Sequence, residues 1–207
     1  MLKIIGRKTS SNVQKVLWAC GEMGVPYDRQ DAGLQFGVVN TADYIAMNPN
    51  KLVPTIIEDG FVLWESNSIV RYLAMKHGVG TLCPTDLQLR ASAERWMDWQ
   101  LTTLLRAISP MFHGLIRTPP EKRDAAAIAR SRDEAEEKFG IMDSYLAKTT
   151  YIAGNDFTFG DIPLGIHAYR WFTFEGIERK DLKNLKRWYD LLCQRPAFRE
   201  HIMIGLS

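Results

Sequence analysis

The sequence predicts a small mixed α/β domain followed by an all-helical domain. Residues 1–80 alternate short apolar runs with turn signals in the order β-α-β-(α)-β-β-α, which is typical of a small sheet covered by helices. The strand signals end there, and residues 87–207 show long helical patterns. A chain of 207 residues suits one large domain or two small ones, and we expect two domains, at 1–80 and 87–207.

Apolar spacing defines the first elements of the N-terminal domain. The apolar run Leu2–Gly6 predicts a short buried strand. Apolar residues then recur at spacings of three and four from Val13 to Met23, which predicts a helix. This helix is expected to end at Gly24, because glycine adopts the left-handed conformation of a helix C-terminus at little cost. A second extended segment is expected to begin at Pro26.

Turn residues define the elements that follow. Apolar segments at 55–57 and 61–64 flank Glu58-Asp59-Gly60, and an Asp-Gly pair fits the tight turn of a β-hairpin. An apolar stripe then predicts a helix that ends near His77. In the second domain, proline residues help to separate four expected helices, at about 88–116, 121–147, 159–174 and 182–193.

Charge and composition exclude several classes of protein. The 26 basic and 24 acidic residues leave a net charge of +2, too small for the clustered basic face that binds nucleic acid. No apolar run approaches the ~20 residues that span a bilayer, and the N-terminus lacks the apolar core of a signal peptide. Three cysteines do not make a disulfide framework. We therefore expect a cytoplasmic protein that binds neither nucleic acid nor membranes.

Common cofactor motifs are also missing from the sequence. It has no Cys-x-x-Cys pair, no Gly-x-Gly-x-x-Gly loop and no phosphate-binding loop. The four histidines stand alone, without the spacing of metal ligands, so we expect no metal.

Polar residues gather before the two helices of the first domain. Ser10, Ser11 and Asn12 lie between the first strand and the first helix, where such side chains cap free backbone N–H groups. The same place favours an anion, because the helix dipole and the N–H groups are positive there. Ser66 follows Glu65 before the second helix, and it fits either a cap or a site in which Glu65 holds an ammonium group and Ser66 a carboxylate.

Between these two places lies the pair Val53-Pro54. Proline is tolerated at the start of a strand, where the missing N–H is not needed. A cis bond before Pro54 would expose the Val53 backbone to an extended peptide ligand.

Taken together and in order, these features resemble the cytosolic glutathione S-transferases. The resemblance covers nearly the whole chain and is carried by four pieces, namely Ser10–Val16, Asn48-Pro49 followed by Val53-Pro54, Trp64–Leu73 and Thr158–Ile162. The first piece resembles phi-type and bacterial members that use a serine. The resemblance implies a thioredoxin-like glutathione-binding domain, a helical domain that binds the electrophile, and a homodimer.

The resemblance also implies roles for individual residues. The Ser10 hydroxyl would donate a hydrogen bond to the glutathione sulfur, and Ser11 and Asn12 are near enough to share or replace that role. The residue pair Thr158 and Asp161 would form the family's capping box, which serves folding.

The glutathione itself would lie along two short segments. The Val53 backbone, held by Pro54, would pair with the cysteinyl unit, while Glu65 and Ser66 would bind the γ-glutamyl end. The family often has Gly and then Lys or Gln before the Val-Pro pair. This sequence has Lys51-Leu52 there, so the usual side-chain contact is either lost or supplied by Lys51.

The electrophile is expected between the two domains. Our first choice for its wall is Met111, Phe112 and His113, because Pro110 and Gly114 would interrupt a long helix there; Trp171 is a further candidate. We expect mainly apolar electrophiles. Two interpretations of Arg106 and Arg117 stay open, since they could orient an anionic electrophile or form ion pairs on the surface.

The sequence leaves three functions open. The first is conjugation of the glutathione thiolate to small electrophiles. The second is a non-catalytic ligand carrier that kept the fold, and the third is a glutathione-dependent peroxidase or dehalogenase that uses the same thiolate.

Overall fold

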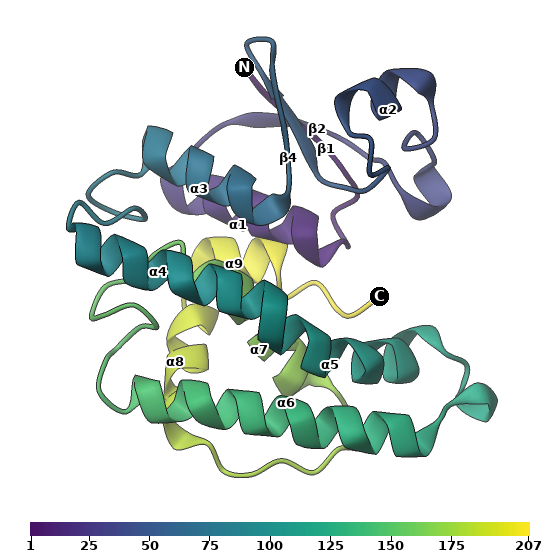
Figure 1. Ribbon diagram of the computed structural model, residues 1–207, viewed down its shortest axis with the longest axis vertical. Helices are drawn as coiled ribbons and strands as arrows, with labels where there is room; N and C mark the ends of the chain where they lie inside the picture. The colour runs from purple at the N-terminus through teal and green to yellow at the C-terminus, as the bar shows by residue number, and fades with distance from the viewer.

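A computed structural model describes all residues from 1 to 207, and the N-terminal part is built on a four-stranded sheet (Figure 1). The strands lie in the order β2-β1-β3-β4, with β1 parallel to β2 and antiparallel to β3, and β3 antiparallel to β4. Their bounds are β1 (Leu2–Ile5), β2 (Tyr27–Gln30), β3 (Thr55–Glu58) and β4 (Phe61–Trp64). The predicted hairpin is present, and its turn residues Asp59 and Gly60 both have the positive φ of a primed turn.

Two helices separate this sheet from the rest of the molecule. Helices α1 (Ser11–Met23) and α3 (Ser66–His77) pack against each other beneath the strands, and the short α2 (Ala42–Met47) lies to one side (Figure 1). Helix α1 ends as predicted, since Gly24 adopts the left-handed conformation with φ 63°.

The second part of the chain is entirely helical. Its helices are α4 (Leu87–Trp99), α5 (Leu105–Phe112), α6 (Ala125–Leu146), α7 (Asp161–Thr173), α8 (Lys183–Cys193) and α9 (Pro196–His201). The short α9 was not predicted, because proline ends most helices. Here Pro196 occupies the first helical turn, where its missing N–H is not needed. None of the helices is long and apolar enough to cross a membrane.

The expected interruption near Pro110 is wrong. The chain stays helical from α4 to Arg117, with π-helical segments at Gln100–Leu104 and His113–Arg117, and Pro110 lies inside α5. A proline inside a helix removes one backbone hydrogen bond, and here the helix continues past that missing bond.

The start of α7 is fixed by a buried carboxylate. Asp161 accepts a hydrogen bond from the Thr158 backbone N–H (2.9 Å), which is one half of the expected capping box, and another from the Thr158 hydroxyl (3.3 Å). The same hydroxyl accepts from the N–H of Gly160 (3.3 Å) rather than from that of Asp161. Asp161 also accepts hydrogen bonds from the Ile152 N–H (2.9 Å) and from the Trp188 indole (2.8 Å), so one side chain joins α7 to α8 and to the preceding loop.

One apolar core runs through both parts of the chain. It joins Val16 of α1 and Ile69 of α3 to Leu104 and Trp171 of the helical part. Helix α1 is buried continuously from Val13 to Cys20, because α3, α7 and α9 all pack against it.

Candidate active site

A cleft of about 630 Å³ lies between the sheet domain and the helical domain. One wall comes from the loop that joins β1 to α1 and from the loop that precedes β3; the other comes from α5, the π-helical segment after it, and α7. A smaller hollow adjoins the cleft and shares Asn12, Leu52 and Val53 with it. The start of α1 therefore lies where the two spaces meet.

Ser10 is placed at the N-terminus of α1 without capping it. Its backbone has the extended conformation of an N-cap residue (φ −78°, ψ 122°), but its side chain accepts no hydrogen bond from the helix. The expectation that a side chain here caps the helix is therefore wrong for Ser10. Its hydroxyl has no partner in the protein and lines the cleft, beside the free N–H groups of the first helical turn. This arrangement favours an anion.

Ser66 connects the starts of α1 and α3. Its hydroxyl donates a hydrogen bond to Oδ1 of Asn12 (3.2 Å) and accepts one from Nζ of Lys15 (3.3 Å). The alternative that Ser66 caps α3 is wrong, because the residue at the N-cap position is Glu65 and no side chain bonds to the helix N-terminus.

Glu65 has an unusual backbone conformation beside this hollow. Its φ of 73° lies in the left-handed region, which costs a residue with a side chain about 1–3 kcal/mol. Such strain persists where the surrounding structure enforces it, and it is concentrated at binding sites. Here it turns the chain from β4 into α3, so that Glu65 and Ser66 both line the smaller hollow.

The Val53 backbone is free to bind a ligand. The peptide bond between Val53 and Pro54 is cis, and neither the N–H nor the C=O of Val53 has a hydrogen-bond partner. The preceding carbonyl, that of Leu52, is held by the Tyr44 hydroxyl (2.6 Å) and the Asn48 amide (2.9 Å). The loop is thus fixed on one side and presents one unpaired backbone edge to the cleft, as domains that bind an extended peptide do.

The opposite wall combines an aromatic ring with cationic side chains. Phe112 and His113 line the cleft, and the guanidinium of Arg170 lies 3.9 Å from the centre of the Phe112 ring. Arg7 and Arg117 line the same space.

Comparison with known proteins decides the family. The family described as "Glutathione S-transferase, N-terminal domain" matches residues 9–76, and "Glutathione S-transferase, C-terminal domain" matches residues 100–196. Glutathione S-transferase GstB of Escherichia coli strain K12 is 44% identical over 209 residues, which cover 100% of both chains. The chain belongs to the glutathione S-transferase family.

Solved structures of other glutathione S-transferases agree with this. A theta class member from Xanthomonas axonopodis pv. citri, solved with glutathione bound, matches with a TM-score of 0.95 and 42% identity, covering 100% of this chain and 99% of that one. Among relatives matched by sequence, glutathione S-transferase F13 of Arabidopsis thaliana is 28% identical, and the match covers 95% of this chain and 93% of that protein. The thioredoxin-like N-terminal domain and the all-helical C-terminal domain predicted from the sequence are confirmed.

The structure of this transferase brings most of the predicted site residues together. The cleft and the adjoining hollow are lined by Ser10, Ser11, Asn12, Lys51, Leu52, Val53, Pro54, Glu65, Ser66, Phe112 and His113. These residues lie at or next to the ends of strands and helices, and the arrangement of these elements brings them close together.

Two predicted residues of the electrophile wall are corrected. Met111 is 0% exposed and Trp171 is 1% exposed, and neither lines the cleft. Trp171 packs against Phe139 instead, with ring centres 5.0 Å apart. Both residues belong to the core of the helical domain. Arg106 does not line the cleft either.

Sequence reasoning missed Lys15, which lies buried beneath the site of this transferase. Its Nζ donates to Ser66 and to Oε1 of Gln100 (3.2 Å), and the amide of Gln100 lies 2.8 Å from Nε2 of His167. Burial lowers the pKa of Lys15 to about 7, and the nearby Arg170 charge acts in the same direction. Lys15 lies off the apolar stripe of α1, so its spacing indicated an exposed position; the helix is instead covered on all sides.

Lys15 makes the stability of the protein depend on pH. Its amine has a pKa of about 7 in the folded protein and 10.5 in the unfolded chain, so between these values the unfolded chain binds more protons. The free energy of unfolding should therefore rise with pH, by about 2 kcal/mol from pH 7 to pH 9.

Replacing Lys15 by methionine isolates this contribution, because the variant keeps the aliphatic stem and all other titrating groups. The free energy of unfolding of both proteins is measured with urea at pH 7 and pH 9. Between these two pH values, the unmodified protein should gain about 2 kcal/mol more stability than the variant. Parallel pH dependence of the two proteins would show that Lys15 titrates normally.

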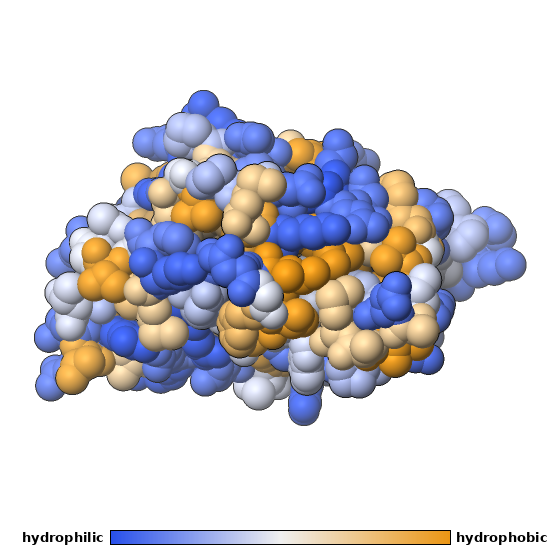
Figure 2. All heavy atoms as spheres, turned by 90° about the horizontal axis from the view of Figure 1, so that it is seen from above, coloured by the Kyte–Doolittle hydropathy of each residue, from blue (hydrophilic) through white to orange (hydrophobic).

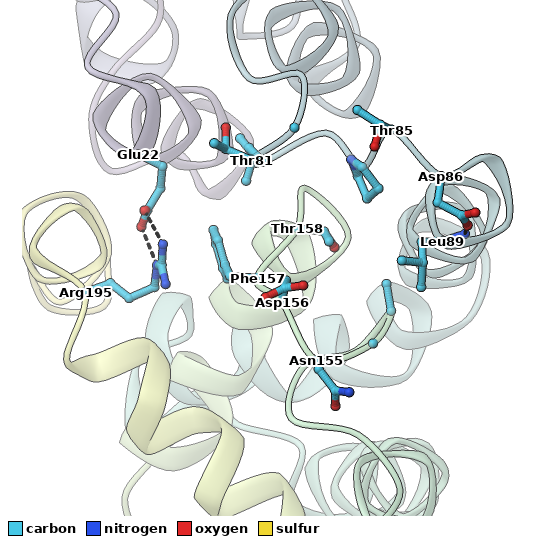
Figure 3. A pocket seen from close by; sticks show the side chains of 15 residues that line it. Glu22, Thr81, Thr85, Asp86, Leu89, Asn155, Asp156, Phe157, Thr158 and Arg195 are labelled. Atoms are coloured by element: carbon cyan, nitrogen blue, oxygen red, sulfur yellow. Dashed lines mark hydrogen bonds and ion pairs between the residues drawn. The ribbon is translucent and has the colours of Figure 1, made fainter.

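A second cavity of about 410 Å³ lies elsewhere in the transferase (Figure 3). It shares no residue with the cleft. Three of its four charged side chains are already engaged, since Arg195 forms an ion pair with Glu22 (2.6 Å), drawn as dashed lines in Figure 3, and Asp86 caps α4. The cleft at Ser10 is therefore the candidate active site.

Proposed function

We propose that this transferase conjugates the thiolate of glutathione to small electrophiles in the cleft. The observation that carries the proposal is the free Ser10 hydroxyl at the N-terminus of α1, in a space that also contains the unpaired backbone of Val53. The theta class relative that shares this fold at 42% identity was solved with glutathione bound.

Glutathione would span both spaces in an extended conformation. The Val53 backbone pairs with the cysteinyl unit, which directs the sulfur toward Ser10. The γ-glutamyl end occupies the smaller hollow, where Glu65 holds the ammonium group and Ser66 with the first N–H groups of α3 holds the carboxylate. Lys51, which is exposed and has no ion-pair partner, meets the remaining carboxylate.

Ser10 and helix α1 are sufficient to activate the thiol. A free thiol has a pKa of ~8.5, so about 3% is ionised at pH 7. Lowering that pKa by about two units requires ~2.7 kcal/mol. One hydrogen bond to a charged acceptor supplies ~1.5–3 kcal/mol, and a helix N-terminus adds ~0.3–1 kcal/mol. The Oδ1 of Asn12 accepts the hydrogen bond from Ser66, which leaves the hydroxyls of Ser10 and Ser11 and the amide N–H groups of Asn12 as donors to the sulfur.

The decisive experiment measures product formation with 1-chloro-2,4-dinitrobenzene and glutathione, followed by absorbance and by mass spectrometry of the thioether. We expect turnover well above the uncatalysed rate. Retention on immobilised glutathione without turnover on a panel of electrophiles would support a carrier instead. Turnover of hydroperoxides or haloalkanes alone would support the peroxidase or dehalogenase.

We also propose that the protein is a cytoplasmic homodimer in which each sheet domain faces the helical domain of the partner. Exposed apolar side chains occur on both parts, among them Phe61 on the edge strand β4 and Leu87 on α4. Figure 2, which looks onto the sheet domain, shows apolar atoms gathered near the centre of that face. Analytical ultracentrifugation should give the mass of two chains, and a mass of one chain at every concentration would contradict the proposal.

A further inference from the structure

Three arginines in the cleft form no ion pair with an aspartate or glutamate side chain. They are Arg7, Arg117 and Arg170, which all line the cleft. The arginines that do pair with side-chain carboxylates are five others, namely Arg29, Arg71, Arg90, Arg132 and Arg195. Lys51 adds a further positive charge, and no aspartate or glutamate lines the cleft. An unpaired cluster of this kind is costly unless an anion neutralises it.

Each of the three side chains is positioned by the fold. The Nε of Arg7 is buried without a hydrogen-bond partner, while its guanidinium packs against Gly33 so closely that a Cβ there would lie 2.9 Å from it. Arg170 is largely buried and stacks on Phe112. Arg117 lies 5.5 Å from the centre of the same ring, and one of its five N–H donors binds the backbone oxygen of Ser207 (2.9 Å).

These arginines are close enough to repel one another. The pKa of Arg7 is lowered by burial and by the charge of Arg117, and burial together with Arg117 lowers the pKa of Arg170 to about 10. An anion bound among them would relieve that repulsion.

The two carboxylates of glutathione do not account for this cluster. The γ-glutamyl end is assigned to the smaller hollow, which none of the three arginines lines, and Lys51 is available to the other carboxylate. Arg117 and Arg170 lie on the helical wall, beside the aromatic face of Phe112.

We propose that the electrophiles of this transferase are aromatic carboxylates, whose ring lies against the helical wall at the exposed His113 and the edge of Phe112 and whose negative charge is held by Arg117 and Arg170. This inference rests on the proposed conjugation reaction and narrows its substrate class. The sequence predicts mainly apolar electrophiles. The proposed substrates keep an apolar ring but also carry a negatively charged carboxylate.

A suitable probe is 4-chloro-3-nitrobenzoate, compared with 4-chloro-3-nitrobenzamide, which has nearly the same shape and no charge. In both reactions the thiolate attacks the ring carbon that carries chlorine, a C–S bond forms, and chloride leaves with the electron pair of the C–Cl bond. The thiol proton goes to solvent, and no oxidant or reductant is consumed.

The test compares kcat/KM for the two probes, each divided by the rate constant for glutathione alone. The carboxylate should be favoured about tenfold, and Arg117→Gln should reduce that preference about tenfold, as expected for one charge-assisted hydrogen bond. Arg106→Gln is the matched control, because it removes the same charge from an exposed arginine that does not line the cleft. It should leave the preference unchanged.

Binding measurements test the anion site independently of the conjugation reaction. Calorimetry should show that 3-nitrobenzoate, which cannot be conjugated, binds more tightly than 3-nitrobenzamide and loses this advantage in Arg117→Gln. Preferential binding without any conjugation would support the anion site and overturn the transferase reaction. Equal affinity for the two compounds, or an equal preference in Arg117→Gln and the unmodified protein, would overturn the anion site whatever reaction is found.

Discussion

Replacing Ser10 by alanine should slow glutathione conjugation about 3- to 25-fold at pH 7. The loss of one hydrogen bond to the thiolate removes ~1.5–3 kcal/mol, which raises the pKa of the bound thiol by roughly one to two units. The deficit should shrink toward pH 9, where the thiol ionises without help. A pH–rate profile measured from pH 5.5 to pH 9 under saturating glutathione shows both effects.

Three further variants make this result specific to the Ser10 hydroxyl. Ser68→Ala removes an exposed hydroxyl from α3, away from the cleft, and should leave the profile unchanged. Ser11→Ala and Asn12→Ala test the neighbouring donors. If Ser10→Ala keeps the original profile while Ser11→Ala shifts it, the hydrogen bond to sulfur belongs to Ser11.

Replacing Asp161 by alanine should destabilise the protein by about 3–5 kcal/mol. The carboxylate is completely buried and accepts four hydrogen bonds, two from Thr158 and one each from Ile152 and Trp188. Truncation leaves these donors buried without an acceptor, and each such group costs ~1–3 kcal/mol before the structure relaxes. Urea unfolding followed by circular dichroism measures the change.

Two other substitutions bracket this prediction. Asp161→Asn keeps one acceptor oxygen and should cost less than the alanine variant. Asp156→Ala removes an exposed aspartate from the same loop and should change the free energy of unfolding by less than about 0.5 kcal/mol. A comparably small effect of Asp161→Ala would mean that water replaces the carboxylate.

The sequence was sufficient to predict the fold and to name the residues that line the two adjoining spaces proposed to hold glutathione. Gly24 and the pair Asp59-Gly60 require particular backbone conformations, so they mark element ends reliably. The residues at 10–12, 51–54 and 65–66 stand next to such ends, and the sheet topology brings these ends together.

The helical wall and the buried polar groups could not be predicted in the same way. Residues 161–171 of α7 are all buried, so periodicity could not distinguish Trp171, which faces the core, from Arg170, which reaches the cleft. Lys15 was missed because a helix packed on several sides has no exposed face for a charged residue. These placements depend on contacts between distant parts of the chain.

The hydrogen-bonded chain from Ser66 through Lys15 and Gln100 to His167 crosses the boundary between the two halves of the molecule. Residues 1–80 expressed alone would retain every residue assigned to glutathione but would expose the Lys15 amine and the apolar faces of α1 to water. The proposed glutathione site therefore depends on the whole chain. Loss of the helical half should abolish tripeptide binding, and the two halves should melt in a single cooperative transition.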